Sequence, residues 1–91
     1  MALGIYFSPT SMTTEKYDEV IRRLDAAGAG KPAGRRNHFC FGPAEKLEVF
    51  DVWDSQETFE AFGAILMPIL AEVGVDPGEP YIRPIHNQIA G

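Results

Sequence analysis

The sequence predicts a single α+β domain in which a four-stranded antiparallel sheet carries two helices on one of its faces. Segments with the two-residue period of strands and segments with the period of helices follow one another in the order strand, helix, strand, strand, helix, strand. The chain has 91 residues, a length that builds one compact unit with a thin core of its own. No linker or internal repeat divides it, so we expect one domain over residues 1–91.

The first half of the chain begins with a strand and a helix. Apolar residues alternate within residues 2–7, as they do in a half-buried strand. A helix is expected after Thr13, which is a good N-cap, and Gly28 supplies the left-handed residue that ends it. The apolar face of this helix consists of Tyr17, Val20, Ile21 and Leu24.

The second half opens with a hairpin. Residues 37–42 and 47–53 have strand character and are separated by a short loop that contains Gly and Pro. Asp54 is expected to cap a second helix that runs to Val73. Pro68 lies inside this helix and is expected to kink or locally break its last turns.

Residues 81–89 are expected to form the last strand. Pro84 within it lacks an amide hydrogen, and such a residue is tolerated only at the edge of a sheet. The order βαββαβ in fewer than a hundred residues is that of a ferredoxin-like sheet with strand order 4-1-3-2. The fourth strand lies at an edge in that topology, in agreement with Pro84.

Two helices cover only one face of such a sheet, and the other face of a monomer is normally polar. Here both faces carry large apolar side chains: Phe50 and Val52 oppose Leu47, Val49 and Trp53 in one strand, and Phe39 and Phe41 oppose Cys40 in its neighbour. Leaving such side chains in water forgoes roughly 1.5–3 kcal/mol for each. We therefore expect a homodimer in which two sheets pack face to face as a dimeric α/β barrel.

The composition excludes several classes of partner. Thirteen acidic and eight basic residues leave a formal charge of −5, which disfavours nucleic acid and membrane surfaces as partners. Cys40 is the only cysteine, and neither a signal peptide nor a membrane span is apparent, so we expect a cytoplasmic protein. The basic loop at residues 28–36 lacks the strand, motif and helix of a phosphate-binding loop and is interpreted as solvated. The alternative is that Lys31, Arg35 and Arg36 draw anionic ligands toward one end of the barrel.

The segment at residues 49–62, "VFDVWDSQETFEAF", carries a resemblance to a known family. It resembles the strand-to-helix segment of the dimeric α/β-barrel superfamily, particularly its antibiotic-biosynthesis-monooxygenase-like branch. The pattern there is an aromatic-rich strand that ends in Trp-Asp/Glu-Ser and a helix that opens with an acid, any residue and Phe. By element order the resemblance extends over the whole chain.

The resemblance implies two enzyme activities that can be compared with the residues. Haem-degrading members use an Asn in the first strand, a Trp at the end of the third and a His in the second helix. Trp53 matches the Trp, but the first strand has no Asn and residues 55–73 have no His, so haem degradation is not expected. The cofactor-free monooxygenases of aromatic polyketides and quinols are similar at Trp53 and in fold, and they imply that no cofactor is needed.

His38 and Asp51 are the candidate catalytic residues. Imidazole exchanges protons near neutral pH, and a half-buried strand position brings His38 near a bound substrate. Asp51 lies two residues before Trp53 and on the same face, so it places a carboxylate beside an aromatic plate. Structural hydrogen bonds or an ion pair are the alternative roles for both residues.

Trp53, Tyr6, His86 and Arg83 are the candidate ligand-binding residues. We expect the barrel to enclose a small, mostly apolar cavity, with Trp53 as one of its walls. Tyr6 is expected to offer a hydroxyl, and Arg83 to be a cation that pairs with Asp51. No metal site is expected, because His38 and Cys40 are two ligands only and His86 lies three strands away, about 14 Å at ~4.8 Å per strand.

Two hypotheses for the function remain. The first is a small-molecule-binding dimer that oxidises an aromatic or quinol-like substrate without a cofactor, with a base and a dry pocket as its machinery. The second is a non-catalytic binding or structural homodimer whose interior is filled by side chains. An open pocket of a few hundred Å³ would favour the first, and a packed interior the second.

Overall fold

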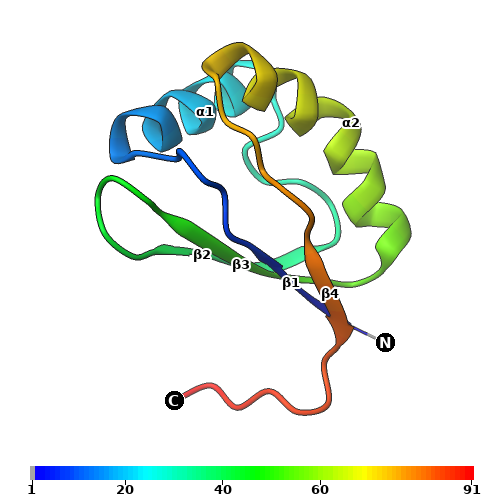
Figure 1. Ribbon diagram of the computed structural model, residues 1–91. Coiled ribbons are helices and arrows are strands. Elements are labelled where there is room, and N and C mark those ends of the chain that lie inside the picture. The colour runs from blue at the N-terminus through cyan, green and yellow to red at the C-terminus, as the bar shows by residue number, and fades with distance from the viewer. Residues whose placement is uncertain (1) are drawn as a thin grey trace.

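A computed structural model, which describes residues 2–91, confirms the order βαββαβ. The elements are β1 (Leu3–Phe7), α1 (Thr14–Ala26), β2 (Arg35–Phe41), β3 (Glu48–Trp53), α2 (Gln56–Val73) and β4 (Tyr81–Pro84). The strands form one antiparallel sheet in the order β2-β3-β1-β4, which is the predicted order read from its other edge. Both helices lie on the same side of this sheet (Figure 1).

Helix α1 begins and ends where the sequence predicts. The Thr13 side chain accepts a hydrogen bond from the Lys16 amide and so satisfies one of the free N–H groups of the first turn. Ala27 caps the other end, and Gly28 follows with a φ of 74°. The helix buries Val20 and Leu24 toward the sheet.

Helix α2 has a different cap from the one expected. Ser55, and not Asp54, is the N-cap, and its hydroxyl accepts from the Thr58 amide. Asp54 forms an ion pair with Arg36 instead. Helix α2 ends at Gly74, which adopts the left-handed conformation.

Of the two outcomes expected at Pro68, a kink or a local break, the break does not occur, because α2 runs through Pro68 to Val73. The carbonyl that loses its amide partner belongs to Ala64, four residues earlier. Both Ala64 and Pro68 lie on the exposed side of the helix. Water can therefore bind this carbonyl, and the helix continues.

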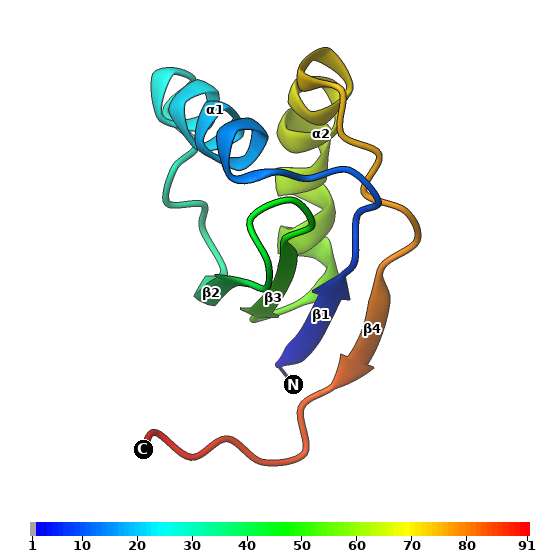
Figure 2. The same cartoon turned by 60° about the vertical axis from the view of Figure 1, so that its left-hand side comes forward.

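The last strand is shorter than expected and ends at Pro84, not at Ile89. The chain then turns under the sheet on the side opposite to the helices (Figure 2). The Ile85 amide donates to the Ala2 carbonyl, and the Gln88 side chain donates to Asn37 on β2. Residues 85–91 thus cover one end of the face that the helices leave open.

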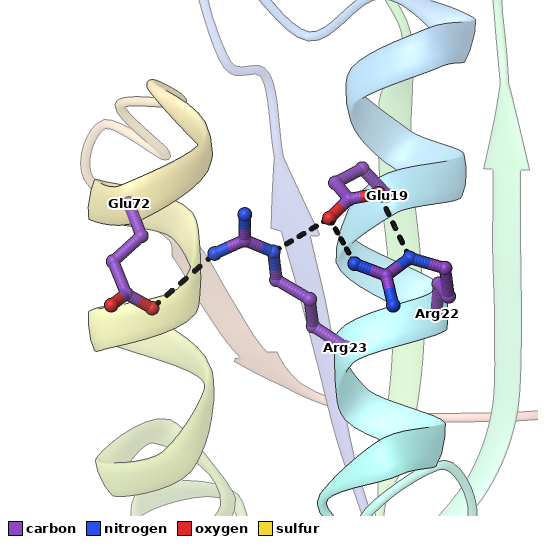
Figure 3. A network of polar contacts seen from close by, with 4 residues as sticks. All are labelled: Glu19, Arg22, Arg23 and Glu72. Carbon is purple, nitrogen blue, oxygen red and sulfur yellow. Dashed lines mark hydrogen bonds and ion pairs between the residues drawn. The ribbon is translucent and has the colours of Figure 1, made fainter.

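The hydrophobic core lies between the sheet and the two helices, where Trp53 and Ile5 are fully buried. At the outer surface the helices are joined by ion pairs (Figure 3): Glu19 binds Arg22 and Arg23, and Arg23 reaches Glu72 on α2 at 3.5 Å. Hydrogen bonds from the two arginines lower the pKa of Glu19 to about 2. Exposed pairs of this kind contribute little to stability. Within residues 2–91 no helix has the length and apolar character needed to span a membrane.

Candidate active site

The strand register brings the two predicted catalytic residues together. His38 on β2 lies directly opposite Asp51 on β3, and both side chains point toward the helices. Asp51 is 4% exposed and is the only charged residue among the buried ones in the described chain. A carboxylate in such a place is stable only when its oxygens are hydrogen-bonded.

Both oxygens of Asp51 have a donor. His38 Nδ1 lies 2.6 Å from Asp51 Oδ1, and Trp53 Nε1 donates to Oδ2 at 3.1 Å. The other ring nitrogen, His38 Nε2, lies 2.7 Å from the Tyr17 hydroxyl of α1, and the Tyr17 and His38 rings stack with an interplanar angle of 3°. Four side chains from three elements therefore form one hydrogen-bonded chain.

This arrangement determines which nitrogen of His38 accepts a proton. A carboxylate only accepts, so Nδ1 carries the hydrogen that faces Asp51. In the neutral ring Nε2 is then the acceptor, and the Tyr17 hydroxyl donates to it. Burial raises the pKa of Tyr17 to about 12, which keeps its phenol protonated at neutral pH.

The chain of hydrogen bonds opens into a cavity of about 70 Å³ between the sheet and the helices. Its polar lining residues are Tyr17, Arg35, His38 and Asp51. The rest of its lining is apolar and comes from both helices, β1, β3 and the loops above them. The cavity thus lies inside one subunit, whereas the sequence led us to expect it inside the barrel.

A second hollow lies outside this cavity, between the α1–β2 loop and α2. It has a volume of about 300 Å³, and its lining includes Lys31, Thr58 and Ile65. Phe62 lines both spaces and is 5% exposed. The Phe62 side chain therefore separates the inner cavity from the outer groove.

Trp53 is placed behind the site. It is fully buried, packs edge-on against Phe59 and holds Asp51 through its indole N–H, but it does not line the cavity. Its contact with the site is the hydrogen bond to the carboxylate.

The other three predicted ligand-binding residues lie away from the cavity. Tyr6 is on the open face of the sheet, where its hydroxyl donates to Glu48. Arg83 stacks over the Tyr81 ring at 4.2 Å on β4 and does not contact Asp51, which is paired with His38 instead. His86 is exposed in the tail that follows β4.

Two residues of the cavity were absent from the sequence-based prediction of the site. Tyr17 has the spacing of a core residue of α1. Arg35 belongs to a loop interpreted as solvated, with attraction of anionic ligands as the alternative, and it was not included among the predicted site residues. The polar hydroxyl of Tyr17 at a core position was the available signal for one of them. Among residues 2–91 no group of three or more His, Cys, Asp or Glu side chains is placed to hold a metal ion.

Comparison with solved structures identifies the fold. A single-residue mutant of SnoaB, a cofactor-independent oxygenase from Streptomyces nogalater, aligns with a TM-score of 0.70 over 99% of this chain and 98% of that chain, at 13% identity. A proposed antibiotic biosynthesis monooxygenase from Chloroflexus aurantiacus aligns with a TM-score of 0.65 over the full length of both chains, at 14% identity. The chain has the fold of the antibiotic biosynthesis monooxygenases.

A further solved structure has the same fold. Rv0793 from Mycobacterium tuberculosis aligns with a TM-score of 0.66 over 99% of this chain and 100% of that chain, at 12% identity. No family model matches the sequence, and no curated protein is significantly similar to it. At these sequence identities the comparisons show that the backbone follows the same path as in the monooxygenase fold.

Proposed function

We propose that the protein is a cofactor-independent monooxygenase that acts on a small aromatic or quinol-like substrate, with His38 as its general base. The observation that carries this proposal is the hydrogen-bonded chain Trp53–Asp51–His38–Tyr17, whose outer end opens into an apolar cavity. A buried polar chain of this kind is costly in a core, where apolar side chains of the same volume serve as well for stability.

The geometry suits proton removal from a substrate hydroxyl or an activated carbon. Asp51 holds the His38 ring in one orientation and stabilises the positive charge that the ring gains when Nε2 takes a proton. Tyr17 lines the cavity together with His38, so its hydroxyl can accept a hydrogen bond from the substrate while it donates to His38 Nε2. The proton then moves along two hydrogen bonds to the imidazole.

The reaction requires no further electron donor. Removal of the hydroxyl proton from an electron-rich phenol or quinol leaves a phenolate, which has carbanion character at its ring carbons. A ring carbon that carries a hydrogen gives two electrons to dioxygen and forms a hydroperoxide. Loss of water from the hydroperoxide leaves a carbonyl group, so one oxygen atom enters the product and the other leaves as water. The apolar lining supports this sequence because it keeps bulk water from reprotonating the phenolate.

The size of the cavity limits the substrate. A cavity of about 150 Å³ holds one benzene molecule, whereas the inner cavity measures about 70 Å³. One aromatic ring therefore enters only when a lining side chain moves. Phe62 is the residue placed to move, because the outer groove of about 300 Å³ lies on its other side.

A homodimer forms part of this proposal. The strand register lines up Phe39, Phe50, Tyr6 and Tyr81 as one aromatic row across the open face of the sheet. Phe39 is 54% and Tyr81 58% exposed in the single subunit. A second copy packed on this row would bury it and would leave the helix-side cavity untouched.

Oxygen uptake tests the proposal. Quinols and small phenols are added to the protein freed of metal ions and flavin, and dioxygen consumption is followed with an electrode. We expect consumption that is abolished in His38→Gln, which keeps hydrogen-bonding groups but is not a base, and retained in His86→Gln. Equal activity in His38→Gln and the unchanged protein would contradict the role of His38, and uptake only after flavin or metal is added would contradict the cofactor-free reaction.

The alternative function is a non-catalytic homodimer that binds or merely encloses a small molecule. The small inner cavity and the exposed aromatic row favour it, because both fit a protein selected for association alone. The two functions differ in the same assay. Binding of a phenol without oxygen consumption by any compound supports the alternative.

A further inference from the structure

The position of Arg35 depends on an irregularity in β2. Along this strand Asn37 pairs with Val52 and Arg35 pairs with Trp53, so Arg36 is an extra residue without a partner. In a regular strand Arg35 would share the open face with Asn37 and Phe39. The bulge turns Arg35 to the helix side, where it lines the cavity, and Arg36 pairs with Asp54 at the surface.

The charge of Arg35 has no carboxylate partner inside the protein. No Asp or Glu oxygen of the described residues lies within 4 Å of it, and its guanidinium donates to the Gly30 carbonyl and lies 5.7 Å from the centre of the Phe62 ring. A guanidinium has five N–H donors in a planar fork that matches a carboxylate. Arg35 therefore brings to the largely apolar cavity a positive charge that no carboxylate of the described residues contacts directly.

The register gives the spacing between this charge and the hydrogen-bonded chain. Arg35 lies opposite Trp53 and His38 opposite Asp51, which are two residues apart on β3. Two residues of a strand span about 6.6 Å. Arg35 and the hydrogen-bonded chain therefore lie next to each other on the helix side of the sheet, where both line the cavity and one ligand can contact both.

We propose that the ligand of the site is a single aromatic ring that carries both a carboxylate and a hydroxyl group. Arg35 binds the carboxylate, and the hydroxyl contacts Tyr17 at the outer end of the chain to His38. This inference rests on the proposed function for the location of the site, and it names the class of compound that enters it. Asp51 favours the same orientation, because its negative charge lies at the hydroxyl end.

The outer groove is consistent with an acidic ligand. Lys31 lies at its rim, close in the chain to Arg35, while the protein as a whole carries a charge of −5. Local positive charge attracts anions that the rest of the surface repels. An acid that enters beside Phe62 passes from Lys31 to Arg35.

Binding of two matched probes tests the inference. We would measure the affinity of the protein for 4-hydroxybenzoate and for its methyl ester, which has the same ring and hydroxyl but no charge. We expect the acid to bind about tenfold to a hundredfold more tightly, the range of a hydrogen-bonded charge contact. Arg35→Gln should remove the preference, whereas Arg36→Gln, one residue away and outside the cavity, should keep it.

Several results would overturn the inference: equal affinity for acid and ester in the unchanged protein, no binding of either, or the same loss of preference in both variants. If Arg35→Gln does not fold, the NMR resonance of the Arg35 Nε–H group is followed in the unchanged protein instead. This resonance must shift when the acid is added and must not shift when the ester is added. The experiment measures binding and not turnover, so its outcome can be distinguished from the outcome of the oxygen-uptake assay. An acid preference that depends on Arg35, without oxygen uptake, would support the proposed ligand and contradict the monooxygenase function. Oxygen uptake with neutral quinols, without an acid preference, would support the monooxygenase function and contradict the proposed ligand.

Discussion

The two faces of the sheet are built from alternate residues of the same strands, and they depart from the usual pattern in opposite ways. On the helix side, where apolar residues are the rule, β2 and β3 place His38 and Asp51 in a buried polar chain. On the open side, where polar residues are the rule for a monomer, they place Phe39 and Phe50. One layer of backbone therefore separates a polar site from an apolar surface.

The stability of the single chain explains neither face. A polar group in the core gains nothing over a well-packed apolar one, and an exposed aromatic row gains nothing in water. We propose a function for each departure: proton transfer on the helix side and association on the open side. If this separation is correct, substitutions on one face should leave the behaviour of the other unchanged.

The largest effect is expected from Asp51→Ala. The change leaves the Trp53 indole N–H and His38 Nδ1 buried without an acceptor, and breaking a buried polar pair in this way costs about 3–5 kcal/mol. We expect a loss of this size in the free energy of unfolding by urea. Asp54→Ala is the matched control, because that carboxylate is exposed and its ion pair with Arg36 is worth at most about 1 kcal/mol.

Equal destabilisation by the two aspartate variants would show that the polar chain at Asp51 is not a linked structural unit. The effect on association is also informative. The dimer should persist in Asp51→Ala wherever the chain is folded, since the residue does not reach the open face.

A smaller effect is expected from Phe39→Glu, which breaks the open face alone. Phe39 is half-exposed in the single subunit, so the monomer should keep its stability. A two-fold interface contains the change twice, and the loss of apolar burial at both positions weakens dimerisation by about tenfold to a hundredfold. Sedimentation of the variant against Met67→Glu, an exposed apolar position on α2, measures this difference. Equal sedimentation of both variants would contradict an interface on the aromatic row.

The smallest effect is expected in the free energy of unfolding at alkaline pH. Burial raises the pKa of Tyr17 to about 12 in the folded chain, above its ordinary value near 10. The folded state thus favours the neutral phenol. The resulting contribution to the free energy of unfolding is complete below pH 10 and is lost as the pH rises toward 12. We expect the stability difference between the unchanged protein and Tyr17→Phe to narrow over that interval. A difference that stays constant from pH 9 to pH 12 would show that the hydroxyl is solvated.

Much of the fold follows from the sequence, because strand and helix periods are local signals. The two-residue period also placed Asp51 and Trp53 correctly on one face, whereas the strand register adds His38 to that face. The predicted end of β4, Ile89, lies beyond its observed end at Pro84. Composition does not mark this end, because apolar residues continue after Pro84.

The rest of the site depends on information that no local pattern contains. Tyr17 meets His38 only because α1 packs across β2, and its spacing in the chain is that of any core residue. Arg35 enters the cavity because of a bulge, which shifts the alternation by one residue and so reverses the face that the period assigns. Neither Tyr6 nor Arg83 reaches Asp51, because strand alternation places both on the opposite face.

The response of the two histidines to a neutral phenol tests the position of the site. The ring nitrogens of His38 and His86 are observed by ¹⁵N NMR while p-cresol is added to the unchanged protein. We expect the Nε2 signal of His38 to shift in a saturable way while the signals of His86 stay in place. A shift at His86 alone, or none at His38 when the protein is saturated with the phenol, would contradict the helix-side cavity as the site.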